Sequence, residues 1–325
     1  MLHGMINVYK EAGFTSHDVV AKLRGIVGQK KIGHTGTLDP EAVGVLPVCL
    51  GSATKLCELL TEKKKSYRAV MLLGRTTDTQ DTSGQTIEER EVSCTDEEIQ
   101  TVMGRFLGAG LQVPPMYSAL KIGGKRLYEL AREGKEVKRE PRPVTFYELR
   151  FLSRQNTEVC FEVTCSKGTY IRTLCADIGE ALGCGACMKE LIRYRVDRFC
   201  LEDAKTLAEL ERLSREGRIQ EALLPVDTLF SICPSAQVTP AGERYLKNGN
   251  PLTEEQLETW EEPELQQEEN PERGLPESVF SKEGLPEGII RVYDSEGCFQ
   301  ALYQRKQDSK QREAFYQPWK TFFQT

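Results

Sequence analysis

The side chains best suited to chemistry lie in one glycine-rich stretch, KIGHTGTLDPEAVGVLP, at positions 31–47. It contains the carboxylate of Asp39, directly before a proline, and the imidazole of His34, one of three histidines in the chain. A carboxylate can act as a nucleophile or as a base. An isolated aspartate before proline more often shapes a turn, and a lone histidine more often packs or caps, so these two residues alone favour a structural interpretation.

Several well-known catalytic arrangements are missing from the sequence. There is no G-x-S-x-G elbow, no phosphate-binding G-x-x-x-x-G-K-[ST] loop and no G-x-G-x-x-G dinucleotide fingerprint. Asp39 and Glu41 are too close in sequence to flank a sugar ring as the two carboxylates of a retaining glycosidase do. The chemistry that remains is that of one carboxylate acting without a second acid.

The eleven cysteines do not indicate a metal or redox centre. Cys184 and Cys187 have C-x-x-C spacing, but no second pair lies at the spacing of a zinc ribbon, and the three histidines are all far upstream. An odd number of scattered cysteines in a chain of 325 residues is also unlike a secreted disulfide framework. We therefore expect buried thiols, no metal site and no cofactor.

Hydrophobic periodicity and capping residues predict the elements that position this stretch. Ser16 as an N-cap and Gly28 as a stop bound one helix, and Thr95 with Glu98 forms the capping box of another. A third helix begins near position 171, which puts Arg172 in its first turn beside a strand end. This order of elements favours an α+β fold with a mixed sheet. The predicted helices cover 16–28, 52–62, 95–108 and 171–183, and the predicted strands cover 66–74, 144–153, 157–166 and 191–201.

Charge is unevenly distributed along the chain, whose net charge is −6. Positions 254–277 hold ten acidic residues and one basic residue, so the rest of the chain carries a net charge of +3. Eight basic residues against four acidic ones lie at 121–142, and lysines cluster at 63–65 beside Arg68. This distribution is compatible with a phosphate-backbone partner, although on charge alone a solvated helix face is the simpler interpretation.

The sequence gives no indication of a membrane segment or a leader. No apolar run approaches the ~20 residues that a membrane span needs. The start of the chain, MLHGMINVYKEAGFTSHDVV, lacks the cationic and then apolar pattern of a signal peptide. We expect a cytoplasmic protein that does not contact a membrane.

The glycine-rich stretch resembles the active-site loop of the TruB family of tRNA pseudouridine synthases, whose pattern is close to G-H-T-G-x-L-D-P-x-A-x-G-x-L-P. Further similarity follows in the family's order, in CLGSATK at 49–55, KSYRA at 65–69, KGTYIRTL at 167–174, and LGCGA and LIRYRV between 182 and 196. The resemblance spans about residues 5–230. The matching loop positions are Gly33, His34, Thr35, Gly36, Leu38, Asp39, Pro40, Ala42, Gly44, Leu46 and Pro47.

The resemblance implies three catalytic residues. Asp39 is similar to the aspartate that attacks during uridine isomerisation. Tyr67 is similar to the tyrosine that stacks on the target base and takes part in proton abstraction. Arg172 resembles the arginine that pairs with the catalytic aspartate, a role that suits a guanidinium because it is always charged and binds carboxylates bidentately.

The same resemblance implies four substrate-binding residues. His34 is similar to a histidine near the flipped nucleotide, and Leu191 to an apolar residue that lines the base pocket. Lys65 belongs to the KSYRA motif. Lys10 matches a K-P-x-G-x-T-S element in which this chain has Glu11 instead of proline, a departure that leaves the glycine-rich motif untouched.

The resemblance also implies an α+β pseudouridine synthase core, flanked by helices, with a small β-rich, PUA-like domain at its C-terminal end. Positions 1–230 correspond to the catalytic domain, with a basic insertion at about 109–143 that grips the tRNA. Positions 231–325 correspond to the PUA-like RNA-binding domain, with a flexible acidic insertion at about 252–286.

The implied function is that of the bacterial tRNA pseudouridine-55 synthases, which convert a T-loop uridine to pseudouridine. The N-glycosidic bond breaks, the uracil turns, and it rejoins the ribose through C5, after the base has left its stack. Whether Asp39 attacks C1′ or removes a proton at C2′ stays open. The expected partner is the T-arm of tRNA, with a monomeric chain and no obligate protein partner. Two alternatives are a tRNA-binding or folding chaperone with an accessory or silent active site, and an RNA-guided synthase subunit.

Overall fold

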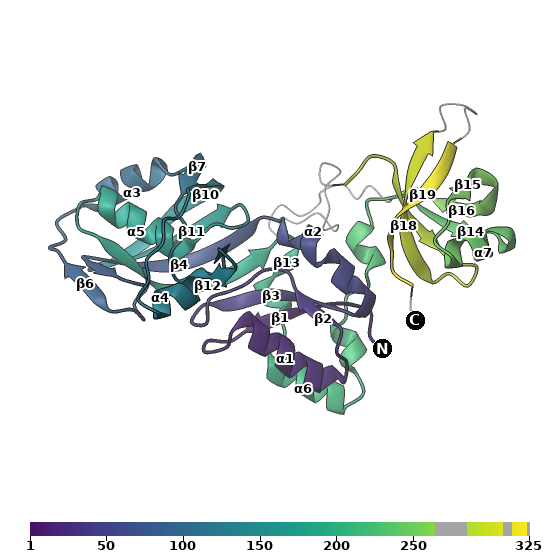
Figure 1. Ribbon diagram of the computed structural model, residues 1–325, viewed down its shortest axis with the longest axis horizontal. Coiled ribbons are helices and arrows are strands. Elements are labelled where there is room, and N and C mark those ends of the chain that lie inside the picture. Colours follow the sequence, from purple (N-terminus) through teal and green to yellow (C-terminus); the bar gives the residue numbers. More distant parts are fainter. Residues whose placement is uncertain (264–284, 308–313, 324–325) are drawn as a thin grey trace.

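The computed structural model describes residues 1–263, 285–307 and 314–323. Most of its strands belong to two separate sheets that lie toward opposite ends of an elongated molecule (Figure 1). A nine-stranded sheet is formed by residues up to Cys200, and a six-stranded sheet by residues from Ser235 onward. The predicted α+β class, with a β-rich C-terminal part, is confirmed.

The large sheet is mixed and carries the elements that surround Asp39. The strand order is 1-3-12-4-11-10-7, with strand 2 paired to strand 3 and strand 13 to strand 12. Its pairs are antiparallel except that of strands 3 and 12. The strands are β1 (Gly4–Lys10), β2 (Ile32–His34), β3 (Val43–Leu50), β4 (Lys65–Leu73), β7 (Gly108–Gln112), β10 (Arg142–Gln155), β11 (Glu158–Cys165), β12 (Ala186–Val196) and β13 (Phe199–Cys200).

The parallel contact of β3 with β12 depends on one glycine. Gly44 has φ +108°, and a Cβ at this position would lie 2.3 Å from the carbonyl oxygen of Arg193. Because no side chain fits in that space, only glycine lets the two strands come this close. The close approach brings β12 next to the loop that carries Asp39.

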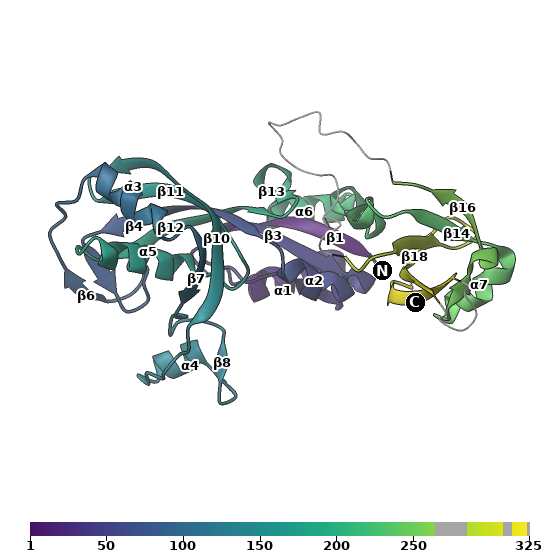
Figure 2. The same ribbon diagram turned by 90° about the horizontal axis from the view of Figure 1, so that it is seen from above.

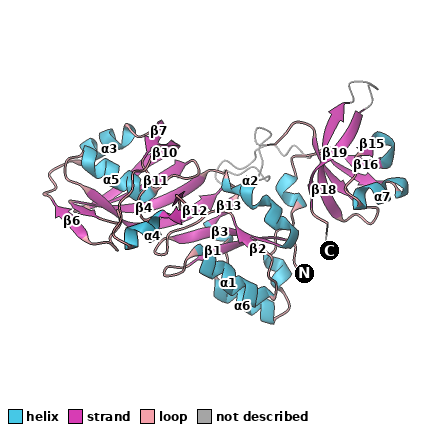
Figure 3. Cartoon of the chain, in the orientation of Figure 1, coloured by secondary structure: helices cyan, strands magenta, loops and turns pink. Residues whose placement is uncertain are grey.

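Helices cover different parts of this sheet, as Figure 3 shows. Two helices, α3 and α5, pack with β4, β10 and β11 in one hydrophobic cluster, while α1 and α6 lie side by side and pack with β1 and β3 in another. The helices are α1 (Ser16–Val27), α2 (Cys57–Thr61), α3 (Asp96–Gly104), α4 (Leu127–Arg132), α5 (Ile171–Ala181), α6 (Leu207–Arg215) and α7 (Pro240–Lys247). Short 3-10 helices are η1 (Gly51–Leu56), η2 (Leu201–Asp203), η3 (Ile219–Ala222), η4 (Asp227–Phe230) and η5 (Glu254–Gln256).

The C-terminal sheet has the order 15-19-18-17-14-16 and its own core. A fourth hydrophobic cluster joins the two parts, because Phe230 of η4 and Leu302 and Phe322 of the C-terminal part pack with Leu56 and Leu60. The strands are β14 (Ser235–Val238), β15 (Leu252–Thr253), β16 (Leu257–Glu261), β17 (Ile289–Tyr293), β18 (Phe299–Gln307) and β19 (Ala314–Thr321).

The helix before the Asp39 loop is predicted correctly except for its first residue. Its end at Gly28 is confirmed by the left-handed conformation of that glycine, with φ 67°. Thr15, and not Ser16, is the N-cap, because the Thr15 hydroxyl accepts from the Asp18 amide while the Asp18 carboxylate accepts from the Thr15 amide. The side chain of Ser16 instead accepts a hydrogen bond from the amide of Leu38 in the loop.

The other predicted elements are present with shifted ends, except that the predicted strand at 191–201 is divided between β12 and β13, which pair antiparallel. The predicted helix at 52–62 is divided into η1 and α2, and α3 ends at Gly104 rather than at Gly108, where β7 begins. Two small hairpins lie outside the main sheets. Their strands are β5 (Arg75–Thr77) with β6 (Thr86–Glu89), and β8 (Lys121–Ile122) with β9 (Lys125–Arg126).

The two predicted insertions have different outcomes. Figure 2 shows β8 and α4 of the basic segment projecting away from β7 and β10, as a hairpin followed by a helix. The acidic insertion is predicted to start too early, because residues 252–261 form β15, η5 and β16 of the C-terminal sheet. Positions 264–284 lie outside the described residues.

Candidate active site

The loop between β2 and β3 places Asp39 against the first turn of α5. Arg172 Nε lies 2.8 Å from Asp39 Oδ2, and Arg172 Nη2 lies 3.1 Å from Asp39 Oδ1, which makes a bidentate ion pair. The Arg172 side chain is 4% exposed and the Asp39 side chain 36%. The guanidinium is therefore enclosed by protein, while part of the carboxylate remains open to a substrate.

Arg172 is itself held by other groups that fix its plane. Its Nη1 donates to the carbonyl of Thr79 at 2.9 Å, and its Nη2 donates to the carbonyl of Tyr117 at 2.8 Å. Asp81 Oδ2 lies 3.6 Å from Nη1 as a second carboxylate partner. Asp81 was not among the residues predicted from the sequence; the available signal was its place in the polar segment TTDTQD, directly after a strand.

Lys10 anchors the back of the Asp39 loop. Its Nζ donates to the carbonyls of Glu11, Pro40 and Ala42 at 3.0, 2.8 and 2.6 Å, and the side chain is fully buried. Burial lowers the pKa of Lys10 to about 8, against the opposing effect of the nearby Asp39 carboxylate. The ammonium thus faces loop carbonyls and no open surface, and a contact of Lys10 with substrate stays a prediction.

Replacing Lys10 by methionine should loosen this loop. Methionine has a similar length but no donor, so the carbonyls of Pro40 and Ala42 lose their partner. We expect the free energy of unfolding to fall by about 2 kcal/mol. Amide hydrogen exchange should become faster across residues 36–45. Lys22→Met, an exposed substitution on α1, is the matched control and should change neither quantity. Unchanged exchange in Lys10→Met would show that the loop does not depend on this anchor.

Tyr67 and Leu191 lie on one face of the sheet beside the ion pair. In the pairing of β4 with β12, Leu191 is opposite Ala69, and cross-strand partners share a face, as do residues two apart. Tyr67 and Leu191 are 6% and 7% exposed and belong to the same hydrophobic cluster as Leu38 and Ile171. The structure thus brings both side chains together with the sequence neighbours of Asp39 and Arg172.

Arg193 is a buried residue that our sequence analysis missed. It is 1% exposed and lies opposite Tyr67 in the β4–β12 pairing. Its Nε donates to the carbonyl of Val45 at 2.8 Å, and its terminal nitrogens donate to the carbonyls of Thr37 and Gly36, both at 3.3 Å. The signal for it was the motif LIRYRV, where an arginine two residues after Leu191 must share the inward face of the strand.

His34 ends β2 and lies at the start of the loop. Its Nδ1 accepts from the amide of Gly36 at 3.3 Å, and its ring packs edge-on against His17 at 5.4 Å between centroids. Burial, with smaller contributions from the nearby His17 and Arg193, lowers the pKa of His34 to about 4. The imidazole is therefore neutral near pH 7, with Nδ1 as acceptor and the Nε2 proton available to donate.

The lowered pKa of His34 predicts an acid-dependent loss of stability. The unfolded chain binds a proton on this imidazole below about pH 6.5, whereas the folded protein does so only near pH 4. Stability therefore falls as the pH is lowered through this window. Denaturant titrations at pH 7 and at pH 4.5 give the free energy of unfolding of each protein. After allowance for the partial exposure of His34, the decrease from pH 7 to pH 4.5 should be about 2 kcal/mol larger for the natural chain than for His34→Gln.

His17→Gln is the control for this pH effect, because it removes the exposed ring and leaves His34 in place. It should keep most of the acid-dependent loss. An equal loss in the natural chain and in His34→Gln would mean that the His34 proton is not linked to folding.

The ammonium of Lys65, like that of Lys10, binds backbone carbonyls. Its Nζ donates to the carbonyls of Thr61 and Lys63 at 2.9 and 2.8 Å, and burial lowers its pKa to about 8. Its stem lies under Gly36, where an added Cβ would be 3.3 Å from Lys65 Cε. Lys65 therefore supports the loop from beneath, and its expected contact with substrate stays a prediction.

The C-x-x-C pair is buried, as expected, with Cys184 4% and Cys187 0% exposed. Across residues 1–263, 285–307 and 314–323, no group of three or more His, Cys, Asp or Glu side chains is arranged to hold a metal ion. Within the same ranges, no helix is long and apolar enough to cross a membrane.

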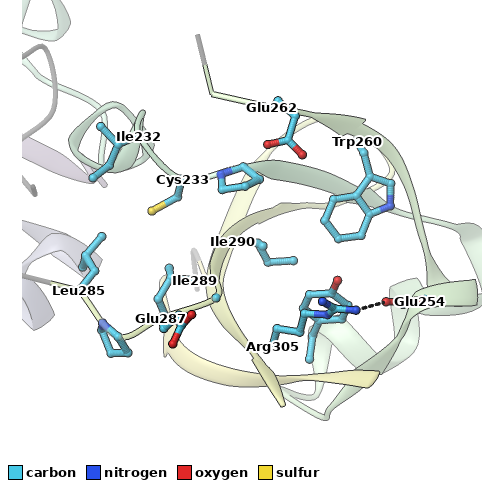
Figure 4. Close-up of a pocket in the computed structure, with 14 residues that line it drawn as sticks. Ile232, Cys233, Glu254, Trp260, Glu262, Leu285, Glu287, Ile289, Ile290 and Arg305 are labelled. Carbon is cyan, nitrogen blue, oxygen red and sulfur yellow. Dashed lines mark hydrogen bonds and ion pairs between the residues drawn. The ribbon is translucent and has the colours of Figure 1, made fainter. Parts of the chain in front are cut away.

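A separate pocket of about 800 Å³ lies in the C-terminal part (Figure 4). Arg305 pairs with Glu254 at 3.2 Å, and the excess of glutamates makes the pocket lining negative. The lining contains no residue of the Asp39 loop or of α5, so the pocket is distinct from the candidate active site. Its lining residues include Ile290, Trp260, Arg305, Glu254, Glu262 and Glu287.

Comparisons with known proteins agree with the resemblance of the loop. Residues 24–171 match the family described as TruB family pseudouridylate synthase (N terminal domain), and residues 172–231 match the tRNA pseudouridylate synthase B C-terminal domain. The chain is 48% identical over 329 residues to tRNA pseudouridine synthase B of Lachnoclostridium phytofermentans, covering 99% of this chain and 100% of that one. It is 40% identical over 305 residues to tRNA pseudouridine synthase B of an Enterobacter species, covering 91% and 93%.

A solved structure shows similarity over nearly the whole chain. A chain of the crystal structure of a Cbf5-Nop10-Gar1 complex is 26% identical, with a TM-score of 0.66, and the match covers 99% of this chain and 85% of that one. The match extends past residue 231, so it includes the C-terminal sheet as well as the large one.

Proposed function

The chain belongs to the TruB family of pseudouridine synthases, and from this membership we propose that it isomerises the T-loop uridine of tRNA, at position 55, with Asp39 as the catalytic carboxylate. The observation that carries the proposal is the bidentate Asp39–Arg172 pair, in which the arginine is enclosed and the carboxylate is partly open. Such a carboxylate is oriented before substrate arrives, which favours attack or proton removal at a fixed place.

Arg172 orients the carboxylate through its two hydrogen bonds. A guanidinium does not lose its proton in proteins, so it cannot take part in the proton transfers of the reaction. Its bonds to the carbonyls of Thr79 and Tyr117 fix the plane in which Asp39 is held. The reaction then breaks the N-glycosidic bond, turns the uracil and joins C5 to C1′.

Tyr67 and Leu191 form the two sides of the proposed base pocket. A flipped uracil can stack on an aromatic ring and pack against an apolar side chain. Both side chains are now almost fully covered, so an entering base must displace neighbouring groups to reach the tyrosine ring. His34 offers its Nε2 proton on the same side of the molecule as the Asp39 loop.

The basic insertion is the segment proposed to bind the T-arm of tRNA. It projects from the large sheet (Figure 2), and Lys121, Lys125 and Lys135 on it are exposed. It is linked to the site because Arg172 binds the carbonyl of Tyr117, within the same segment. We propose domains at 1–230 and 231–325, with RNA contacts of the second domain outside its negatively charged pocket, which disfavours phosphate.

The stand-alone enzyme is preferred to an RNA-guided subunit because the identity is 48% with a tRNA pseudouridine synthase B and 26% with the Cbf5-Nop10-Gar1 structure. Pseudouridine in a tRNA transcript can be mapped by carbodiimide modification and primer extension after incubation with the purified chain alone. We expect one new modified base, at the T-loop uridine. Modification elsewhere would overturn the assigned position, and bound but unmodified tRNA would favour the chaperone or a partner-dependent enzyme.

A further inference from the structure

A buried guanidinium connects Tyr67 to the loop that carries Asp39. Arg193 donates to the loop carbonyls of Gly36, Thr37 and Val45, and its guanidinium lies near enough to the phenol of Tyr67 to favour the ionised form of the tyrosine. Arg193 and Tyr67 are direct cross-strand neighbours on β12 and β4. One side chain therefore fixes the distance between the ring on which the base is proposed to stack and the loop with the catalytic carboxylate.

The positive charge of Arg193 is buried without a carboxylate partner in the described residues. A buried cation is costly unless it is paired, and backbone carbonyls neutralise it less well than a carboxylate does. In the parts of the chain that the structure describes, no carboxylate forms an ion pair with Arg193, and its hydrogen-bond acceptors are three backbone carbonyls. Of the two ionisable side chains that act on this guanidinium, Tyr67 and Cys165, the tyrosine has the larger effect and is its direct cross-strand neighbour.

We propose that Arg193 is a positioning residue for the isomerisation: its guanidinium holds the phenol oxygen of Tyr67 against the Asp39 loop and stabilises the phenolate that accepts the C5 proton. The proposal rests on the proposed function. Tyr67 first releases its hydroxyl proton to water. When C5 has joined C1′, the C5–H bond breaks, its electrons stay in the uracil ring, and its proton moves to the Tyr67 oxygen. N1 takes its proton from water, so the base gains one proton and loses one.

The charged and titratable groups around Tyr67 leave Arg193 as its direct cationic contact. Burial raises the pKa of Tyr67 to about 12, and Arg193 opposes this rise. The Cys165 thiol on β11 and the Asp39 carboxylate also face the phenol, and both raise its pKa. Lys65 lies near Arg193, but its ammonium is bonded to the carbonyls of Thr61 and Lys63. Removing Arg193 therefore removes the group that favours the phenolate.

The test replaces Tyr67 by 3,5-difluorotyrosine, whose more acidic phenol brings the titration into an accessible pH range. Its ¹⁹F signal reports the pKa of residue 67 directly, without tRNA. Arg193→Gln should raise this pKa by about one unit or more, as expected when a neighbouring opposite charge is lost. A pKa within about 0.3 units of that in the natural background would overturn the proposal, because a shift that small lies far below the effect of a contacting charge.

Tyr303 provides the matched control position. It is fully buried, its hydroxyl donates to the carbonyl of Asn250 at 3.0 Å, and burial raises its pKa to about 12. Difluorotyrosine at position 303 should titrate identically with and without Arg193→Gln. If Arg193→Gln does not fold, Arg193→Lys decides the matter. It keeps the charge, so the pKa of difluorotyrosine at position 67 should stay within about one unit of its natural value; a larger rise would contradict the proposal.

A rescue experiment separates this role from a purely structural one. Arg193→Gln should lower the single-turnover rate constant by about 100-fold with tRNA affinity unchanged. Difluorotyrosine at position 67 should recover at least about tenfold of that loss, because its phenolate needs less stabilisation. No recovery would mean that Arg193 does not act through the phenol. Absence of turnover in the natural chain would instead contradict the proposed function, while the ¹⁹F titration would still test the contact.

Discussion

Asp39→Asn should abolish isomerisation, lowering the single-turnover rate constant by at least about 10⁴-fold, while tRNA affinity stays within about threefold. Asparagine has the same shape as aspartate and can still accept a hydrogen bond from Arg172, so the loop should keep its course. It has no charge and can neither attack carbon nor take a proton. Single-turnover kinetics with excess enzyme and a filter-binding titration measure the two quantities separately.

Glu41→Gln is the control for this substitution, because Glu41 is an exposed carboxylate two residues away in the same loop. It should react at close to the natural rate. Asp39→Asn also leaves the buried Arg172 with one hydrogen bond fewer and without the charge of its partner, so we expect a loss of about 2 kcal/mol in the free energy of unfolding. Normal turnover by Asp39→Asn would show that another group is the catalytic carboxylate.

Arg172→Lys should lower the single-turnover rate constant by about 10²–10³-fold although the positive charge is kept. Lysine is a point charge on a flexible stem. It cannot make both bonds to Asp39 and also reach the carbonyls of Thr79 and Tyr117. The carboxylate should therefore lose its fixed orientation, which would appear in the rate constant for isomerisation more than in the affinity for tRNA.

Arg218→Lys is a matched control for Arg172→Lys. Arg218 also pairs bidentately with a carboxylate, through Nε and Nη2 to Glu221, but its side chain is 52% exposed. Such surface pairs contribute little to stability, so this variant should behave like the natural chain in both assays. Equal rates for Arg172→Lys and the natural chain would mean that charge alone, and not the two-point contact, is what Asp39 needs.

Local elements were predictable wherever sequence signals act over a few residues. The capping box of Thr95 and Glu98, the left-handed stop at Gly28 and the helix that starts just before Arg172 all depend on neighbours within four positions. Residues 252–261 were wrongly predicted to be part of a flexible acidic insertion, because the prediction relied on their acidic composition and not on the spacing of their apolar residues. Residues such as Leu252 and Leu257 are buried in the C-terminal sheet despite their acidic neighbours.

The site was only partly predictable because several of its contacts join distant positions. Asp39 and Arg172 were found through their motifs, yet the ion pair itself spans 133 positions. The bonds of Lys10 to the loop carbonyls were not predicted, because sequence alone does not show that β1 ends behind the loop. Arg193 and Asp81 went unnoticed since arginine and aspartate usually lie at the surface. The pairing of β12 with both β3 and β4, which buries Arg193, is a property of the whole sheet.

Release of tritium from tRNA labelled at uracil C5, with the purified chain and no added cofactor, tests the central claim most directly. Isomerisation at one uridine must free one C5 hydrogen per tRNA. We predict that one equivalent is released by the natural chain, and none when the T-loop uridine is replaced by cytidine or when Asp39 is replaced by asparagine. Bound tRNA without tritium release would contradict the account, and full release by Asp39→Asn would contradict the role given to Asp39.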